Sequence, residues 1–310
     1  MNIEKNKGVY YGVVSALTWG IDTVLVGIIL GATPFISDSN AMLLAPLVST
    51  FLHDFFSTIW TFIYLAAKGQ VGRLVKSFKT KSARYVVLGA LLGGPIGMTG
   101  YLLSIKYLGA SYTASFSSIY PAVGAILAAI ILKEKLHKKA YIGLALSILG
   151  IVAMGYTKGS DGASILGFIF VSLCIIGWGS EAVICAYGMK DDEVDSESAL
   201  QIRQLTSAVV YGFIIIPIIK AFPLIMNTLQ NNVIYLIAVT ALFGTISYLC
   251  YYAAIYKIGA TKAMGLNITY VVWAILFDLI LLKNPISIKT IIFGSIIMIG
   301  SYLVAKDYNE

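Results

Sequence analysis

Charged residues are scarce in this sequence. Asp, Glu, Lys and Arg make up 12% of the 310 residues, whereas 58% are hydrophobic and the mean hydropathy is +0.85. Soluble domains are about one quarter charged, so this composition excludes a soluble fold. Long apolar stretches recur along the chain, and each can cross about 30 Å of hydrocarbon as a helix. The sequence therefore predicts an all-α membrane protein.

Motifs for catalysis and metal binding are also missing. The chain has no HExxH, no GxSxG and no glycine-rich phosphate loop. It has two histidines, and its three cysteines lack CxxC or metal-type spacing. The net charge of +7 belongs to short loops rather than to a nucleic-acid surface. We therefore expect no enzyme activity, cofactor, metal or nucleic-acid partner. A membrane-embedded enzyme or a structural subunit is the alternative from another class.

The hydrophobic pattern predicts ten membrane-spanning helices. They lie near residues 9–30, 41–67, 84–106, 109–132, 139–156, 164–188, 198–220, 232–256, 260–282 and 287–305. Ten crossings put both termini on one side of the bilayer. If that side is cytoplasmic, 17 Lys and Arg residues lie inside and 5 outside, as the positive-inside rule favours. The inside count includes Arg203, near the start of the seventh span.

The chain also contains an internal repeat. Seven residues recur without a gap at an offset of 150: Tyr101, Ile105, Gly109, Ala110, Tyr120, Leu132 and Lys133 match Tyr251, Ile255, Gly259, Ala260, Tyr270, Leu282 and Lys283. The segment from Trp19 to Asp22 likewise resembles the segment from Trp178 to Glu181. We therefore expect two five-helix repeats, 1–157 and 158–310. An odd number of spans inverts the second copy, which is typical of secondary transporters with alternating access. Duplication without transport is the alternative.

Acidic residues within spans need an explanation, because each costs about 2.5–3.5 kcal/mol to insert. Four acids qualify, and these are Asp22, Asp54, Glu181 and Asp278. No Lys or Arg is expected comparably deep, since Lys106 and Lys257 lie at helix ends and can reach the headgroups. An interior with acids and without fixed cations should attract an organic cation or protons.

His53 and Asp54 form an unusual pair in the second span. A histidine beside a buried carboxylate can relay protons, so we assign a candidate proton-coupling role to Asp22, His53 and Asp54. The alternative is structural: His53 makes a helix–helix hydrogen bond, and a neighbouring hydroxyl satisfies Asp54. The residues by themselves leave both interpretations open.

Aromatic residues gather in the same spans. Trp19 lies three residues before Asp22, and Trp178 lies three before Glu181, so each pair shares a helix face. Ring faces and a carboxylate hold a quaternary ammonium, which has no N–H to donate. The candidate substrate-binding residues are Trp19, Trp178, Glu181, Tyr248, Tyr251, Tyr101, Tyr120 and Tyr270, with Glu181 foremost. For the tyrosines, simple packing or an interfacial position is the alternative.

Small residues and proline predict local features of two further spans. Gly89, Gly93 and Gly97 form a small-residue face on the third span, which predicts close helix packing. Pro121, directly after Tyr120, predicts a bend in the fourth span.

The duplicated layout, the Leu132-to-Lys135 run and the segment from Tyr112 to Pro121 resemble the drug/metabolite transporter superfamily of the EamA type. Within it, the segments His53-Asp54-Phe55, 177–181 and 187–189 resemble the LicB-type bacterial choline permeases. The resemblance implies import of choline across the bacterial plasma membrane, energised by an ion gradient, with protons the expected ion. It also implies an aromatic cage with an acid, which fits Trp19, Trp178, Glu181, Tyr248 and Tyr251.

Other substrates and directions remain open at this stage. An exporter of cationic drugs or metabolites would use the same cage, and a neutral amino-acid or nucleobase carrier would not need Glu181. Betaine and carnitine also carry a quaternary ammonium. Their carboxylate is disfavoured by the expected absence of a deep Lys or Arg.

Overall fold

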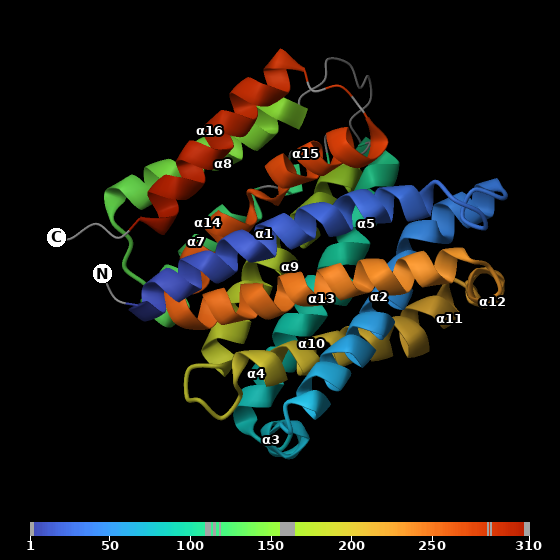
Figure 1. Ribbon diagram of the computed structural model, residues 1–310, viewed down its shortest axis with the longest axis horizontal. Helices are drawn as coiled ribbons and strands as arrows, with labels where there is room; N and C mark the ends of the chain where they lie inside the picture. Colours follow the sequence, from blue (N-terminus) through green and yellow to red (C-terminus); the bar gives the residue numbers. More distant parts are fainter. Residues whose placement is uncertain are drawn as a thin grey trace.

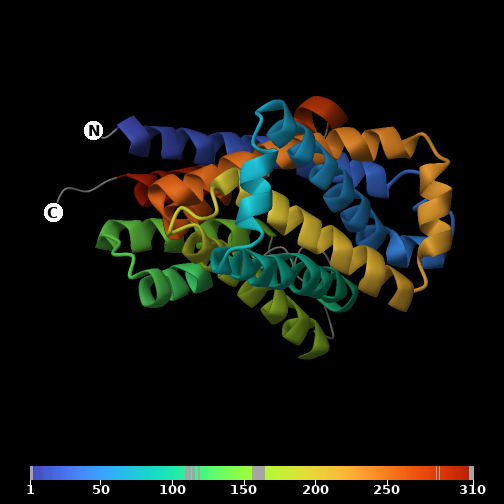
Figure 2. The same cartoon turned by 90° about the horizontal axis from the view of Figure 1, so that it is seen from below.

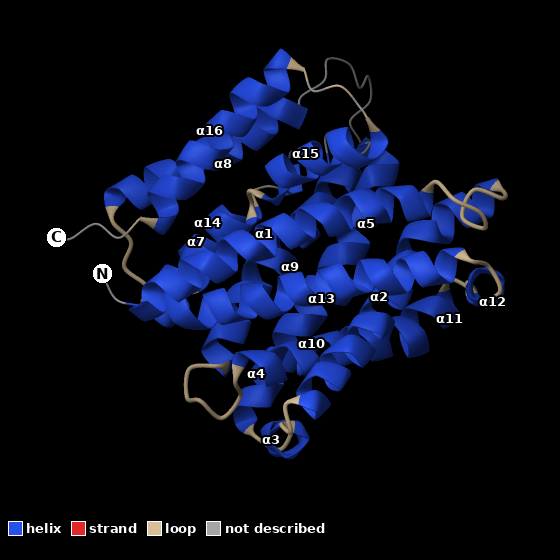
Figure 3. Ribbon diagram, in the orientation of Figure 1, coloured by secondary structure: helices blue, strands red, loops and turns tan. Residues whose placement is uncertain are grey.

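The computed structural model describes residues 3–108, 113, 116–117, 119–155, 165–283, 285 and 287–306. These residues form helices and connecting loops, with no strand in this part of the chain (Figure 3). The elements, with η marking π-helical turns, are α1 (Ile3–Leu30), α2 (Ser39–Ala67), α3 (Val71–Ser77), α4 (Lys81–Leu91), η1 (Leu92–Met98), α5 (Thr99–Leu108), α7 (Tyr120–Leu127), η2 (Ala128–Leu132), α8 (Lys138–Gly155), α9 (Ile165–Gly188), α10 (Ser196–Val210), η3 (Tyr211–Ile215), α11 (Ile216–Ile218), α12 (Phe222–Leu229), α13 (Val233–Ile258), α14 (Ala260–Asn267), α15 (Tyr270–Leu282) and α16 (Ile288–Ala305). The start of α1 and the end of α16 lie at the same end of the molecule (Figures 1 and 2).

Eight helical segments among the described residues are long and apolar enough to cross a membrane. They are Glu4–Leu30, Ser39–Ala67, Lys81–Ile105, Ile165–Gly188, Ser196–Ile218, Val233–Ile258, Ala260–Leu282 and Ile288–Ala305. Large apolar side chains such as Phe213 (81% exposed) face outward, as expected of surfaces that contact lipid. The prediction of an all-helical, multi-pass membrane protein is therefore confirmed.

Two of the ten predicted spans do not appear among these eight. The fourth corresponds in part to a shorter apolar helix, Tyr120–Leu132, and the fifth corresponds to α8. The fourth span's predicted start at residue 109, the fifth span's end at 156, the sixth span's start at 164 and the repeat boundary at 157/158 lie outside the described residues. Residues 109, 110, 112, 114, 115 and 118 of the quoted sequence matches lie there as well.

Four predicted spans depart from a continuous α-helix, and the fourth and seventh contain the π-helical turns η2 and η3. The third runs through α4, η1 and α5, and its π-helical turn contains Pro95. The ninth is broken at Ile268 and Thr269, between α14 and α15. The sequence pattern did not predict that break, because residues 260–282 taken together are apolar enough for one continuous span. Short helices α3 and α12, which lie in connections between spans, were not predicted either.

Residues matched by the offset of 150 occupy matching places in the fold. Tyr120 begins α7, with Pro121 in its first turn, and Tyr270 begins α15. Proline is tolerated there because the first turn of a helix needs no backbone donor. Lys133 and Lys283 follow the ends of η2 and α15, and both adopt a left-handed conformation with φ of 56° and 58°.

The packing of the helices follows a matching pattern. In Figure 1, α1 and α13 lie side by side, and α8 lies beside α16. Helix α1 of the first half packs most extensively on α13 of the second, while α9 of the second half packs on α4, η1 and α5 of the first. Helices α2 and α10 also pack on each other. The two halves of the sequence are thus interleaved, and the region where α1, α9, α10 and α13 meet draws residues from both.

Polar side chains tie α13 to its neighbours. Ser247 donates to the Ser15 carbonyl oxygen of α1 at 2.8 Å, and the Trp60 indole of α2 donates to Ala238 O at 2.9 Å. The hydroxyls of Ser57 and Thr245 lie 2.7 Å apart. Such hydrogen bonds hold apolar helices together in lipid, where burial of apolar surface gives no driving force.

Candidate functional site: a cavity lined by aromatic rings

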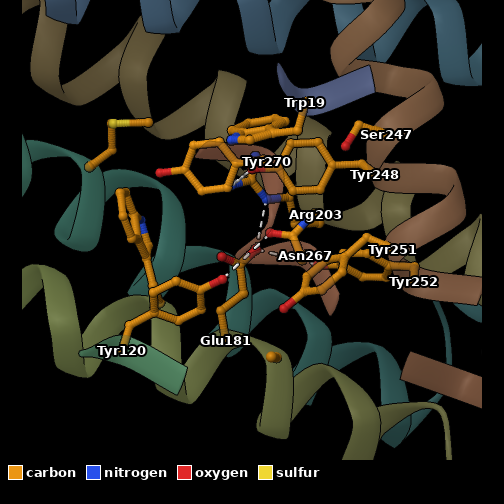
Figure 4. A pocket seen from close by; sticks show the side chains of 13 residues that line it. Trp19, Tyr120, Glu181, Arg203, Ser247, Tyr248, Tyr251, Tyr252, Asn267 and Tyr270 are labelled. Carbon is orange, nitrogen blue, oxygen red and sulfur yellow. Dashed lines mark hydrogen bonds and ion pairs between the residues drawn. The ribbon is translucent and has the colours of Figure 1, made fainter. Parts of the chain in front are cut away.

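A cavity of about 90 Å³ lies between α1, α9, α10, α13 and the residues around the break after α14. Its walls are largely aromatic, as Figure 4 shows. The lining residues are Trp19, Met98, Tyr120, Trp178, Glu181, Ala182, Arg203, Ser247, Tyr248, Tyr251, Tyr252, Asn267 and Tyr270. The cavity therefore contains seven of the eight candidate substrate-binding residues, all except Tyr101.

The two tryptophans are held by neighbouring rings. Trp19 makes an edge-to-face contact with Tyr248, with centroids 5.0 Å apart. Trp178 stacks on Tyr101 at 5.3 Å and meets Tyr120 edge-on at 5.8 Å. Aromatic pairs of this kind contribute about 0.5–1.5 kcal/mol beyond their buried area, so the rings hold one another in place. Tyr101 thus supports a wall of the cavity from behind.

Glu181 projects from α9 into the cavity, and its side chain is 12% exposed. Its Oε1 accepts a hydrogen bond from Arg203 Nε at 2.8 Å and a longer one from the Tyr252 hydroxyl at 3.4 Å. Its carboxylate also lies against Gly93, where any Cβ atom would overlap it. Close approach of η1 to α9 therefore requires glycine at this position.

The small-residue face predicted on the third span packs against α9. A Cβ on Gly89 would lie 2.7 Å from the Cys185 sulfur, and one on Gly97 would lie 3.0 Å from the Trp178 ring. The prediction of close helix packing is confirmed. This packing also sets how far Trp178 and Glu181 extend into the cavity.

Arg203 corrects the expectation that no basic side chain lies deep in the protein. It projects from α10 with only 5% of its side chain exposed, and it lines the cavity. Besides its contact with Glu181, its guanidinium lies 3.4 Å from both oxygens of Asp54 and 4.7 Å above the centre of the Tyr248 ring. Arg203 is the sixth residue of the predicted span 198–220, and the positive-inside count places it among the cytoplasmic basic residues. In the structure its side chain points inward, because its partners lie on α2, α9 and α13.

The candidate coupling residues form a polar chain that reaches this arginine. His53 Nε2 lies 2.8 Å from Asp22 Oδ1, and its Nδ1 lies 3.6 Å from Asp54 Oδ1. Asp54 accepts a hydrogen bond of 2.5 Å from the Ser207 hydroxyl. The chain therefore runs from α1 through α2 to α10. The structural alternative also predicts that His53 makes a hydrogen bond between helices and that a hydroxyl group satisfies Asp54. The geometry is therefore compatible both with proton coupling and with a structural role.

A second, larger cavity of about 340 Å³ adjoins the first. The two share Trp19, Met98, Trp178 and Tyr270. The larger one extends along the C-terminal part of α1 and is also lined by Asp22, His53 and Tyr101, among others. Asp54 lines neither cavity. The shared rings stand between the two spaces, so a ligand in the larger cavity would meet these rings before it reached Glu181.

Six cavity residues were not among the sequence candidates, namely Met98, Ala182, Arg203, Ser247, Tyr252 and Asn267. A charged residue inside a predicted span is the signal that could have identified Arg203. Asn267 is the last residue of α14, and a break that nothing in the sequence predicted places it in the wall. No cluster of three or more His, Cys, Asp or Glu residues suited to a metal ion occurs among the described residues.

Fold and site together define a multi-pass helical membrane protein with an internal cavity of rings and ionisable groups. The sequence profile of the EamA-like transporter family matches residues 6–156 and again residues 165–306. The chain belongs to the EamA-like transporter family.

Individual relatives agree with this assignment. The chain is 35% identical to Protein LicB of Haemophilus influenzae over 298 residues, which cover 95% of this chain and 96% of the relative. The resemblance to LicB-type proteins is thereby confirmed. This chain is also 22% identical to an uncharacterized transporter of Clostridium kluyveri, over 74% of this chain and 76% of that transporter. A solved crystal structure with 15% identity superposes with a TM-score of 0.71 over 96% of each chain, which shows a shared fold.

Proposed function

We propose that this protein is a secondary active transporter that imports choline, or a similar quaternary ammonium, by alternating access. The observation that carries the proposal is the position of Glu181, whose carboxylate lies in a cavity walled by rings from five helical elements. A quaternary ammonium needs that combination, because it has no N–H group to donate and binds through ring faces and a negative charge.

The charge balance of the site also favours a cation. Three carboxyl groups, from Asp22, Asp54 and Glu181, adjoin one guanidinium and one imidazole. With the three acids ionised, the group keeps an excess of negative charge whichever form His53 takes. An anionic substrate would be repelled, and a neutral one would leave that excess uncompensated in a low-dielectric interior.

We also propose that the chain has ten spans in two inverted five-helix repeats, with both termini cytoplasmic in a bacterial plasma membrane. The matching helix starts at Tyr120 and Tyr270 and the matching left-handed residues Lys133 and Lys283 support the repeat. A cavity beside discontinuous helices at the meeting of the two halves is where such transporters bind substrate. Arg203 no longer counts among the cytoplasmic loop residues, because it is buried. The other cytoplasmic Lys and Arg residues still outnumber those outside, which favours this orientation.

The experiment is radiolabelled choline uptake into proteoliposomes, measured with and without an inward proton gradient. We expect uptake that the gradient stimulates and that Glu181→Gln nearly abolishes, while Glu193→Gln, at an exposed glutamate, leaves uptake unchanged. A neutral-substrate carrier predicts no choline uptake by the wild type and a Glu181→Gln variant with its transport intact. An exporter that exchanges choline for protons predicts that the same inward gradient drives choline out of preloaded vesicles and does not stimulate uptake.

Proton coupling through Asp22, His53 and Asp54 is part of this proposal. The support is that His53 lies between two carboxylates, with one ring nitrogen directed to each. We expect His53→Gln to transport choline without stimulation by the gradient. The structural alternative predicts lower stability and an unchanged response to the gradient.

Arg203 removes the earlier argument against betaine and carnitine, since a deep basic side chain is present. Their carboxylate would need a guanidinium that is already engaged by Glu181 and Asp54. We therefore expect choline to compete for its own uptake more strongly than betaine or carnitine does. Competition assays with the three unlabelled compounds measure that order.

A further inference from the structure

Arg203 makes the contacts that the proposed substrate would make. Its guanidinium lies over the ring of Tyr248, with the central carbon 4.7 Å from the ring centroid, and its Nε donates to Glu181 Oε1 at 2.8 Å. Its Nη2 also donates to the Tyr248 hydroxyl at 3.2 Å. In Figure 4 the guanidinium lies between the tyrosine ring and the Glu181 carboxylate. A ring face and a carboxylate are the partners of an organic cation, and here a cation of the protein itself takes them.

Arg203 also has a second set of partners. Its Nη1 donates to Gln204 Oε1 at 2.7 Å and lies 3.4 Å from each oxygen of Asp54. Asp54 belongs to α2 and is held in place by the Ser207 hydroxyl. The guanidinium is thus shared between an acid that lines the cavity and an acid behind it. If a ligand took Glu181, Arg203 could keep its charge paired by a small shift toward Asp54.

We propose that Arg203 forms an ion pair with Glu181 when the cavity is empty. When the substrate cation binds, this ion pair opens and Glu181 pairs with the substrate instead. This inference rests on the proposed function. It goes further by assigning to Arg203 a role in the step that returns the empty transporter.

The physical reason lies in the two closures that a transporter must make. In net transport the cavity closes once with substrate and once without, and each closure removes water from Glu181. A carboxylate that loses water without a partner is strongly disfavoured in a membrane interior. The substrate cation compensates Glu181 in the loaded step, and Arg203 compensates it in the empty step. Exchange of one substrate molecule for another needs only the loaded step.

Three measurable consequences follow for a variant that lacks this cation. Net transport should slow, because the empty transporter closes with an uncompensated Glu181. Exchange should persist, because both directions proceed with substrate bound. Affinity for the substrate should rise, because Arg203 no longer competes for Glu181 and the Tyr248 ring. A purely structural arginine would give the opposite affinity change and would lower both kinds of transport together.

The experiment compares Arg203→Gln with the wild type in proteoliposomes, using labelled choline. Net uptake is measured into vesicles without internal choline, exchange into vesicles preloaded with unlabelled choline, and affinity by titration of the purified protein. We expect net uptake to fall at least tenfold, exchange to stay within about threefold, and choline to bind several-fold more tightly. Arg84→Gln makes the same chemical change at an exposed arginine and should leave all three unchanged.

Further variants keep the test decisive if Arg203→Gln does not fold. Arg203→Gln combined with Asp54→Asn removes one charge of each sign. Because Asp54 is a proposed coupling residue, this double variant is compared with Asp54→Asn alone, and relative to that variant the same split between net uptake and exchange is expected. Arg203→Lys keeps the cation and should restore much of the net uptake. If uptake and exchange fell together in a variant that folds, or if that variant bound choline more weakly, the inference would be overturned. Choline exchange by the wild type would still support the proposed function in that case. Absence of choline exchange by the wild type would overturn both.

Discussion

Replacing Gly93 by alanine would test how Glu181 is placed without altering any charge. Gly93 belongs to the π-helical turn η1, and an added Cβ would overlap the Glu181 carboxylate and lie 2.8 Å from Glu181 Cβ. The Glu181 carboxylate can rotate away from the added methyl group. The Cβ atom of Glu181 is fixed by the backbone of α9 and cannot move unless the helix moves. Both the stability of the α9 contact and the position of the carboxylate should therefore change.

The size of each effect can be worked out. Overpacking costs about 1–3 kcal/mol, and alanine recovers about 1 kcal/mol relative to glycine in a helix, so we expect a net loss of about 0–2 kcal/mol. Ordinary contact with the new methyl group requires the carboxylate to move by about 1.5–2 Å. If it lies about 4 Å from the bound charge at an effective dielectric constant of about 20, that shift weakens the attraction by about 1.1–1.4 kcal/mol. Choline affinity should fall about five- to tenfold.

Thermal unfolding in detergent and choline titration would measure both effects. The matched control is Gly72→Ala in α3, where an added Cβ has no atom within 4 Å and only the helix preference changes. That variant should be as stable as the wild type or slightly more so, with unchanged affinity. If Gly93→Ala matched Gly72→Ala in both measurements, the close contact between η1 and Glu181 would be refuted.

Four other variants give smaller tests. Trp178→Ala should weaken choline binding in titrations about 2- to 30-fold, which corresponds to the loss of about 0.5–2 kcal/mol of cation–π attraction. Trp60→Phe removes an interhelix hydrogen bond outside the cavity, so the Tm should fall slightly while the choline Kd stays unchanged. Ser57→Ala removes two buried interhelix contacts, and unfolding in detergent should show a loss of about 1–2 kcal/mol. Gly143→Leu would push a side chain into the Gly300 backbone and should lower the Tm without changing the Kd; an unchanged Tm would contradict the packing of α8 on α16.

Much of the candidate site could be predicted because helical spacing is regular. Trp178 and Glu181 are three residues apart, so one helix had to present both side chains to the same neighbourhood. The insertion cost of a carboxylate made Glu181 a candidate before any contact was known. The repeat at an offset of 150 likewise singled out Tyr120 and Tyr270, which both begin a helix at the cavity wall.

Arg203 could not be placed in the same way. A basic residue a few positions inside a span can extend to the headgroups or turn inward, and its own segment of sequence is compatible with both. The choice depends on Glu181, Asp54 and Tyr248, which come from three other helices and lie 22, 149 and 45 residues away along the chain. Contacts with residues distant in the sequence therefore determine that the Arg203 charge lies in the cavity.

The sequence by itself determined that this protein is helical and membrane-embedded, because the cost of exposing backbone polar groups to lipid leaves an apolar chain few alternatives. It also determined which residues repeat and which acids needed partners. Only the tertiary structure decided which helices meet, where the segment Ala260–Leu282 breaks and which cation pairs with Glu181. Those outcomes depend on side-chain packing between helices remote in sequence, and local composition and periodicity do not specify which partner helix a given face meets.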